Sequence, residues 1–367
     1  MFVRSQFKIT RSATSRQAFT LVELLIVIAI ITILAAVTLP TVKTLLHGQK
    51  VTQAARMVQA HIESARARAI ASGSYVAVIL ERSLSTGTEY NTALALSIGN
   101  TFPPYEGDTL GATGALTDSF ARNASGVYAP GMDDAYDQLT VPAANGSLIT
   151  ADVFGVGDFI RIGRSESLFV ITAKPAGSGT IQFANPPFYT HTDGTQWPTQ
   201  EVQLPTTGSS TALFKIFRKP TKSFVQSTKL PRGTCIDLSV SGIQQTGTQF
   251  ADLTAPLMIV FDERGSVAFV NTGSAISQSP VGLIHLLVGR TEQVAPAGNR
   301  QSLADPNDRT TFTANLNDAE NRWISINPRS GAVHTSSVQT GSETATFAVR
   351  LATARAFATN DIVQTAD

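Results

Sequence analysis

The chain has few of the residue types on which catalytic and metal sites depend. Cys235 is the single cysteine among 367 residues, which excludes an intrachain disulfide and a zinc site built from several cysteines. The five histidines lack ligand spacing such as HExxH, and no GxSxG elbow, Walker loop or Rossmann fingerprint is present. We therefore expect no enzymatic activity, no metal and no cofactor.

Charge is also scarce. Only 15% of the residues are charged and the net charge is +1, so no global field recruits nucleic acid or anionic lipid. Hydrophobic residues make up 43% of a body rich in Gly, Thr, Ser and Ala, which indicates an exported, β-rich protein rather than a disordered one. The length predicts about two domains.

One long apolar run stands out, directly after a basic leader. Residues 1–18 contain Arg4, Lys8, Arg11 and Arg16 and no acidic residue. Residues 19–39 (FTLVELLIVIAIITILAAVTL) would span about 30 Å as a helix, the thickness of a bilayer core. By the positive-inside rule the N-terminus lies in the cytoplasm, and everything after Pro40 lies on the far side of a single-pass span.

Glu23 is the one acidic residue in this run. A secretory signal peptide is the alternative interpretation of a basic start, an apolar run and small residues at Ala35 and Ala36. A carboxylate there typically costs a few kcal/mol to insert and requires a compensating partner. Glu23 therefore argues against a signal peptide, and a free α-amine is the partner that we expect.

The segment QAFTLVELLIVIAIITILAAVTLP resembles the N-terminal motif of type IV pilins and type II secretion pseudopilins. The resemblance implies that a prepilin peptidase cuts between Ala18 and Phe19 and methylates the new amine of Phe19. It also implies that Glu23 pairs with a neighbouring subunit's amine, that Thr20 belongs to the assembly segment, and that Pro40 is the proline that often kinks this helix. The family usually has Gly where this chain has Ala18, the mildest replacement.

Beyond Pro40 the pattern becomes amphipathic. Apolar residues recur at three- and four-residue spacing at Val42, Leu45, Leu46, Val51, Ala55, Val58, Ile62, Ala65 and Ala69. This spacing predicts a helix over 19–71, bent at Pro40 and ended by Gly73. The following stretch, AARMVQAHIESARARAIASGSYVAVIL, resembles H-type minor pseudopilins and FimT-like minor pilins, in which such a helix leads directly into a strand.

The rest of the chain contains short β-like runs bounded by Gly, Pro, Asn and Asp. They lie at 75–81, 159–162, 168–172, 213–217, 257–261, 267–270, 282–288 and 323–326. The runs after residue 228 also resemble the closing strands of that family, with turns at 262–265 and 327–331. We expect an α+β, pilin-like fold, in which a long N-terminal helix packs on an antiparallel β head.

The expected organisation has six parts. They are a cleaved leader (1–18), the membrane half of the helix (19–39), its amphipathic half (40–72), the β head (73–82 and 205–340), an insertion (83–204) and a C-terminal helix or tail (341–367). The first part of the insertion, 83–145, is expected to be loop-like. Alternation over 148–204 predicts a small barrel or meander.

Residues 214–232 hold six basic side chains and no acidic one, with Phe214, Phe217 and Phe224 interleaved. Basic and aromatic side chains together are typical of single-strand binders, and the FimT-like resemblance also implies DNA contact. The candidates for this contact are Lys215, Arg218, Lys219 and Lys222. The alternative is a hairpin whose phenylalanines face the core while these basic residues face water.

We expect a structural subunit: an H-type minor pseudopilin of a type II secretion pseudopilus, anchored in the inner membrane with a periplasmic head and later incorporated into a filament. Its expected partners are the prepilin peptidase, other pilin-like subunits and the inner membrane. The alternative is a FimT-like minor type IV pilin that contributes to pilus assembly or binds DNA.

Overall fold

The structure is a computed structural model. It describes residues 21–83, 91–117, 136–151, 153–164, 167–184, 188–190, 196–198, 210–224, 227–251, 253, 255–273, 276–278, 280–294, 314–339 and 346–365. The side chains of 37–47, 136, 188–190, 196–198, 276–278 and 361–365 lie outside this description. The chain divides into two compact units, Met1–Gln49 and Lys50–Asp367, and each is described by itself.

Helix α1 (Leu21–Ser72) confirms the predicted helix to within two residues at each end and continues through Pro40. It ends at Gly73, whose φ of 59° lies in the left-handed region that glycine adopts without strain. The amide of Ser74 donates to the carbonyl of Ala69 at 3.3 Å, which satisfies a carbonyl that the helix end leaves open. The bend expected at Pro40 stays a prediction, because this side chain lies outside the described ones.

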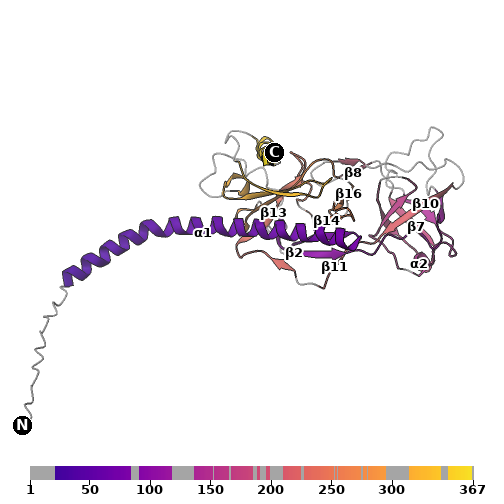
Figure 1. Cartoon of the computed structure of the whole chain (residues 1–367), viewed down its shortest axis with the longest axis horizontal. Coiled ribbons are helices and arrows are strands. Elements are labelled where there is room, and N and C mark those ends of the chain that lie inside the picture. Colours follow the sequence, from indigo (N-terminus) through magenta and orange to yellow (C-terminus); the bar gives the residue numbers. More distant parts are fainter. Residues whose placement is uncertain are drawn as a thin grey trace, which may run out of the picture. The chain divides into compact units, whose positions relative to one another are not determined.

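The part of α1 in the second unit is amphipathic, as its spacing predicts. Val51, Ala55, Val58, Ile62 and the alanines at 54, 65 and 69 are all buried. They form one core with the apolar side chains on one face of a sheet. Small residues predominate on this face of the helix, so its backbone packs close to the strands. Figure 1 shows this part of α1 alongside β2, β13 and β14.

The head is an eleven-stranded antiparallel sheet in the order β16-β15-β14-β1-β2-β13-β17-β18-β19, with β11 and β12 also pairing with β2. Its strands are β1 (Val76–Arg82), β2 (Thr92–Asn100), β11 (Thr221–Lys222), β12 (Thr228–Lys229), β13 (Thr234–Ile243), β14 (Leu257–Phe261), β15 (Val267–Asn271), β16 (Ile276–Gln278), β17 (Ile284–Arg290), β18 (Arg322–Ile326) and β19 (Val333–Ser337). The expected α+β fold with an antiparallel head is confirmed.

A closed six-stranded barrel in the order β10-β3-β4-β7-β6-β5 follows β2 along the chain. Its strands are β3 (Thr113–Thr117), β4 (Tyr136–Thr140), β5 (Phe159–Ile162), β6 (Phe169–Ala173), β7 (Thr180–Ala184) and β10 (Ser210–Phe217), and the short helix α2 (Ser147–Thr150) precedes β5. Strands β8 (Phe188–Thr190) and β9 (Gln196–Pro198) pair with each other. Side chains such as Leu139, Phe169 and Phe183 fill the barrel. The prediction for 148–204 left a barrel or a meander open; the structure has a barrel, but three of its six strands, β3, β4 and β10, lie outside that range.

The expected limits of the insertion, 83–204, are wrong at both ends. Strand β2 belongs to the head, where it pairs with β1 over seven positions, and β10 closes the barrel by pairing with β3 and β5. The prediction that 83–145 is loop-like is also wrong, because β2, β3 and β4 lie within it. These strands have small and polar residues, and distant partners decide where they pair.

Alternation along the central strands explains how the sheet is covered on both faces. In β1, Val76, Val78 and Leu80 face the core that contains α1, whereas Ala77 and Ile79 belong to a second core on the other face. This second core includes barrel residues: the Phe159 ring lies 5.3 Å from the Phe269 ring in an edge-to-face contact. The uninterrupted apolar run of β1 is thus that of a strand buried on both faces.

The C-terminal helix α3 (Phe347–Thr365) confirms the predicted helix and packs on β18 and β19. Leu351, Ala354 and Ala358 form a further core with Trp323 and neighbouring side chains. Arg355 is fully buried within this contact and donates to the carbonyls of Val240, Gln244 and Gly247 at 2.7–2.9 Å. Two short 3-10 helices complete the described elements, η2 (Thr291–Gln293) and η4 (Asn315–Asn317).

Candidate functional sites

The described apolar part of α1, residues 21–34, exposes its large side chains all around the helix. The exposed fractions run from 45% for Val27 to 80% for Leu21. A soluble helix typically exposes polar side chains on at least one face, and an apolar surface of this extent marks a contact with protein or lipid. The polar hydroxyl of Thr32 is satisfied within the helix by the carbonyl of Ala29 at 2.8 Å. Within the first unit, this segment therefore presents an apolar surface of the kind that contacts with protein or lipid cover.

Glu23 lies in the first turn of α1, where a negative charge is favoured by the free amides of a helix N-terminus. Its side chain is exposed. Ala18, Phe19 and Thr20 lie outside the described residues, as does the side chain of Pro40. The structure thus places Glu23 at the start of the apolar helix, and the roles expected of all five residues stay predictions.

In the described part of the chain, no helical stretch meets both the length and the hydropathy that a membrane span requires.

The four basic candidates for nucleic-acid contact are distributed over β10, β11 and the connection between them. Two of them have carboxylate partners: the Lys215 ammonium lies 2.6 Å from Glu106, and Lys222 pairs with Glu81. The Arg218 guanidinium lies 5.0 Å from the centroid of the Phe102 ring, and the backbone amide of Lys219 donates to Asp158 at 2.8 Å. The ion pairs reduce the positive charge that a phosphate backbone would meet.

The three interleaved phenylalanines differ in burial. Phe214 and Phe217 are buried, as the hairpin alternative predicts, but Phe224 is 109% exposed. The expectation that all three face the core is therefore wrong for Phe224. Phe224 follows the two-residue strand β11, which pairs with β2. Its side chain packs into no core there.

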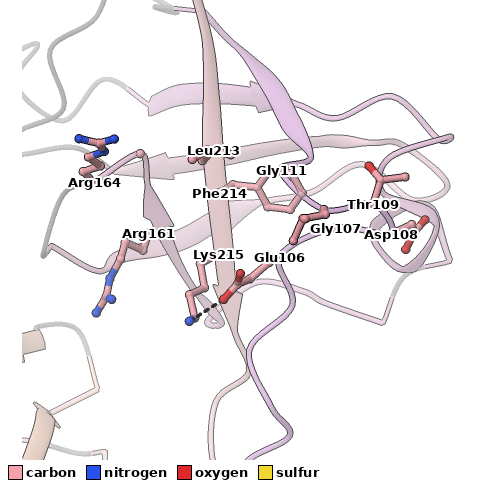
Figure 2. A pocket seen from close by; sticks show the side chains of 12 residues that line it. Glu106, Gly107, Asp108, Thr109, Gly111, Arg161, Arg164, Leu213, Phe214 and Lys215 are labelled. Carbon is pink, nitrogen blue, oxygen red and sulfur yellow. Dashed lines mark ion pairs between the residues drawn. The ribbon is translucent and has the colours of Figure 1, made fainter.

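Sequence reasoning missed a basic groove on the outer face of the barrel (Figure 2). Its cavity of about 560 Å³ lies over β5 and β10, beside the loop at 105–112. Arg161 and Lys215 are cross-strand partners and project in the same direction, while Arg164 lies at the turn after β5. Outward-facing arginines in the alternation FIRIGR were the available signal.

The loop beside this groove is held by a carboxylate. Asp108 accepts from the Tyr105 hydroxyl at 2.5 Å and from the Ser147 amide at 2.6 Å. These hydrogen bonds lower the pKa of Asp108. Partial burial, together with the bond to Asp108, raises the pKa of Tyr105 to about 12. Asp108 thus fixes the loop at 105–112 against the start of α2.

Two buried titratable groups, Cys235 and His285, are kept uncharged by their surroundings. Burial raises the pKa of the Cys235 thiol well above its ordinary value, so the thiol stays protonated and unreactive. His285 is buried on β17, shares a hydrogen bond with Ser325 Oγ at 2.9 Å, and has its pKa lowered to about 3 by burial and by Arg355. Within the described residues no three His, Cys, Asp or Glu side chains are grouped to hold a metal ion.

Residues 14–39 match the family model of the prokaryotic N-terminal methylation motif. No curated protein matches the chain. The match covers the end of the leader, from residue 14 to Ala18, and the whole apolar run with Glu23, and it supports a type IV pilin-like or pseudopilin-like assembly subunit that is processed by a prepilin peptidase.

Proposed function

We propose that this protein is an H-type minor pseudopilin, a structural subunit of a type II secretion pseudopilus. The methylation motif over residues 14–39 carries the proposal. In this proposal, the precursor is anchored in the inner membrane with its N-terminus in the cytoplasm. A prepilin peptidase then cuts between Ala18 and Phe19 and methylates Phe19. The role is structural rather than enzymatic.

The exposed apolar helix supports this proposal. Residues 21–34 lie uncovered on the single chain, and side-by-side packing of such helices would remove their apolar surface from water and lipid. Glu23 is the only acidic residue of the run and stands near its start. In the filament its carboxylate pairs with the methylated amine of a neighbour and sets the axial register of the subunits.

The N-terminus of the mature protein tests processing directly. Mass spectrometry of the purified protein is expected to find N-methyl-Phe19 as the first residue. A start at Met1, or a start after Ala36 as a signal peptidase would produce, would refute the proposal.

Assembly is tested at Glu23. Glu23→Val is expected to reduce incorporation into sheared filaments at least tenfold, because the carboxylate that compensates the amine is lost. Glu63→Val makes the same change at an exposed glutamate farther along α1 and serves as the control. Equal incorporation of the two variants would rule out the pairing role.

A FimT-like minor type IV pilin is the second candidate, and the basic stretch at 214–232 favours it. Co-purification separates the two: secretion-platform components are expected with a pseudopilin, and pilus-motor components with a pilin.

A further inference from the structure

A second cavity, of about 1010 Å³, continues the barrel groove towards the head. Arg161 and Lys215 line both cavities. The far wall of the second cavity consists of two hairpin turns, the β14–β15 turn with Glu263 and Arg264 and the β18–β19 turn with Arg329. The volume is at the upper end of the roughly 300–1,000 Å³ of small-ligand pockets, so the cleft suits an extended chain better than a small molecule.

Both walls of this cleft are held in place. Arg161 and Lys215 are directly opposite each other on the paired strands β5 and β10. The two turns are joined by the Ser266 hydroxyl, which donates to the carbonyl of Arg329 at 2.7 Å. Arg66 of α1 donates to the carbonyl of Gly265 at 3.2 Å. A ligand therefore meets a preorganised site and loses little free energy to ordering it.

Most of the described carboxylates in the cleft and the adjoining groove have partners, whereas the guanidinium of Arg161 has none among the described residues. Glu106 pairs with Lys215, and Asp262 accepts from the amides of Arg264 and Ser266 within its own turn. Among the described residues, Arg161 has no hydrogen-bond or ion-pair partner for its guanidinium, and its Nε is buried. The Arg161 guanidinium lies 5.3 Å from the centroid of the Phe217 ring. A part-buried guanidinium of this kind lacks an anionic acceptor.

The other residues around the cleft favour an acidic peptide over a nucleic acid as the anionic ligand. Among the described residues that line the cleft, Tyr75 is the one aromatic side chain, and it is half-buried in an edge-to-face contact with Phe217, so successive bases find no row of rings on which to stack. Glu263 would repel a continuous run of phosphates. Val281, which is 74% exposed, lines the cleft, and Leu213, which is also exposed, lines the barrel groove that adjoins it. Carboxylates that alternate with apolar side chains match this mixture of arginines and apolar residues.

We propose that the cleft between the barrel and the two head turns, lined by Arg161, Arg264 and Arg329, binds an acidic, partly apolar peptide segment of a partner protein. The peptide's carboxylates pair with the arginines, and its apolar side chains cover Leu213 and Val281. This inference goes beyond the proposed assembly role, which depends on the N-terminal helix.

The test uses the full chain in a nonionic detergent and measures the fluorescence anisotropy of a labelled peptide, (Glu-Val-Glu-Ala)3. Its neutral counterpart, (Gln-Val-Gln-Ala)3, and labelled single-stranded dT12 are measured in parallel. The variants are Arg161→Gln on the barrel wall and Arg264→Gln on the exposed turn of the opposite wall, where folding is little affected. Arg232→Gln changes an exposed arginine outside both cavities and is the matched control.

We expect saturable binding of the acidic peptide, at least tenfold weaker binding of the neutral peptide, and a tenfold or greater loss in both cleft variants. The control should stay within twofold of the wild type. No binding of the acidic peptide, an equal loss in Arg232→Gln and Arg264→Gln, or tighter binding of dT12 would each overturn the proposal. Filament incorporation of Arg264→Gln is expected to be normal, so a failure here is distinguishable from a failure of the assembly role.

Discussion

Acid should destabilise the head through His285. Its imidazole is buried between β17 and β18, shares a hydrogen bond with Ser325, and meets the edge of the Trp323 ring at 6.0 Å. Arg355 of α3 lies 5.6 Å from the centroid of the same ring. Burial first, and the charge of Arg355 second, lower the pKa of His285 from 6.5 to about 3.

The lowered pKa sets both the sign and the size of the effect. The unfolded chain binds a proton at His285 below pH 6.5, but the folded chain does not until about pH 3. The stability from the neutral imidazole is therefore present above pH 6.5 and is lost as the pH falls towards 3. The full shift corresponds to about 5 kcal/mol, of which about 2 kcal/mol is already lost at pH 5.

The assay is urea unfolding of the full chain in detergent, followed by circular dichroism between pH 8 and pH 5. His285→Asn keeps a polar group for Ser325 but cannot titrate. We expect the variant to be less stable than the wild type at pH 8, because asparagine is smaller than histidine and leaves a cavity. At pH 5 the difference in unfolding free energy between the two proteins should be about 2 kcal/mol smaller. His334→Asn, on the edge strand β19, controls for the loss of a histidine as such. Parallel pH curves for His285→Asn and the wild type would refute the reasoning.

Asp237 should act in the opposite direction, because burial raises its pKa from 3.8 to about 6 despite donors from Ser239 and Asn315. Its contribution is present below pH 3.8 and is lost as the pH rises through 6. In the same unfolding assay, extended down to pH 3.5, Asp237→Asn should remove about 2–3 kcal/mol of this pH dependence, of which about 1 kcal/mol falls between pH 5 and pH 6, and an unchanged slope would contradict it. Arg355→Met leaves three carbonyls, those of Val240 and Gly247 buried and that of Gln244 partly so, without their donor and should cost about 2–4 kcal/mol of unfolding free energy, with Arg355→Lys losing less. A smaller loss in the methionine variant than in the lysine variant would show that packing, not hydrogen bonding, holds α3.

The elements that were predicted well are those with a local signal. The apolar run and the spacing from Val51 to Ala69 predict α1, and Gly73 marks its end. The run 257–261 coincides with β14, because a strand buried on both faces is apolar at every position. In such segments the residues themselves decide the conformation, and packing agrees with it.

The assignments that failed depend on distant pairing. Strand β2 has few bulky residues, yet β1 on one side and β13, β12 and β11 on the other hold it in the sheet. Strand β10 was expected in the head, but its pairing with β3 and β5 closes the barrel. Strand partners that lie 52 to 145 residues away along the chain leave no mark on local composition.

The sequence by itself determined the N-terminal motif, because its residues lie within one continuous segment, 14–39, and need no tertiary contact to be identified. Only the tertiary structure decided the arginine cleft. Arg161, Arg264 and Arg329 are far apart along the chain and meet because the barrel packs on one face of the sheet while the two turns project from its strands. A helix is formed by neighbours in sequence, whereas a cleft between two packed layers exists only after both have folded.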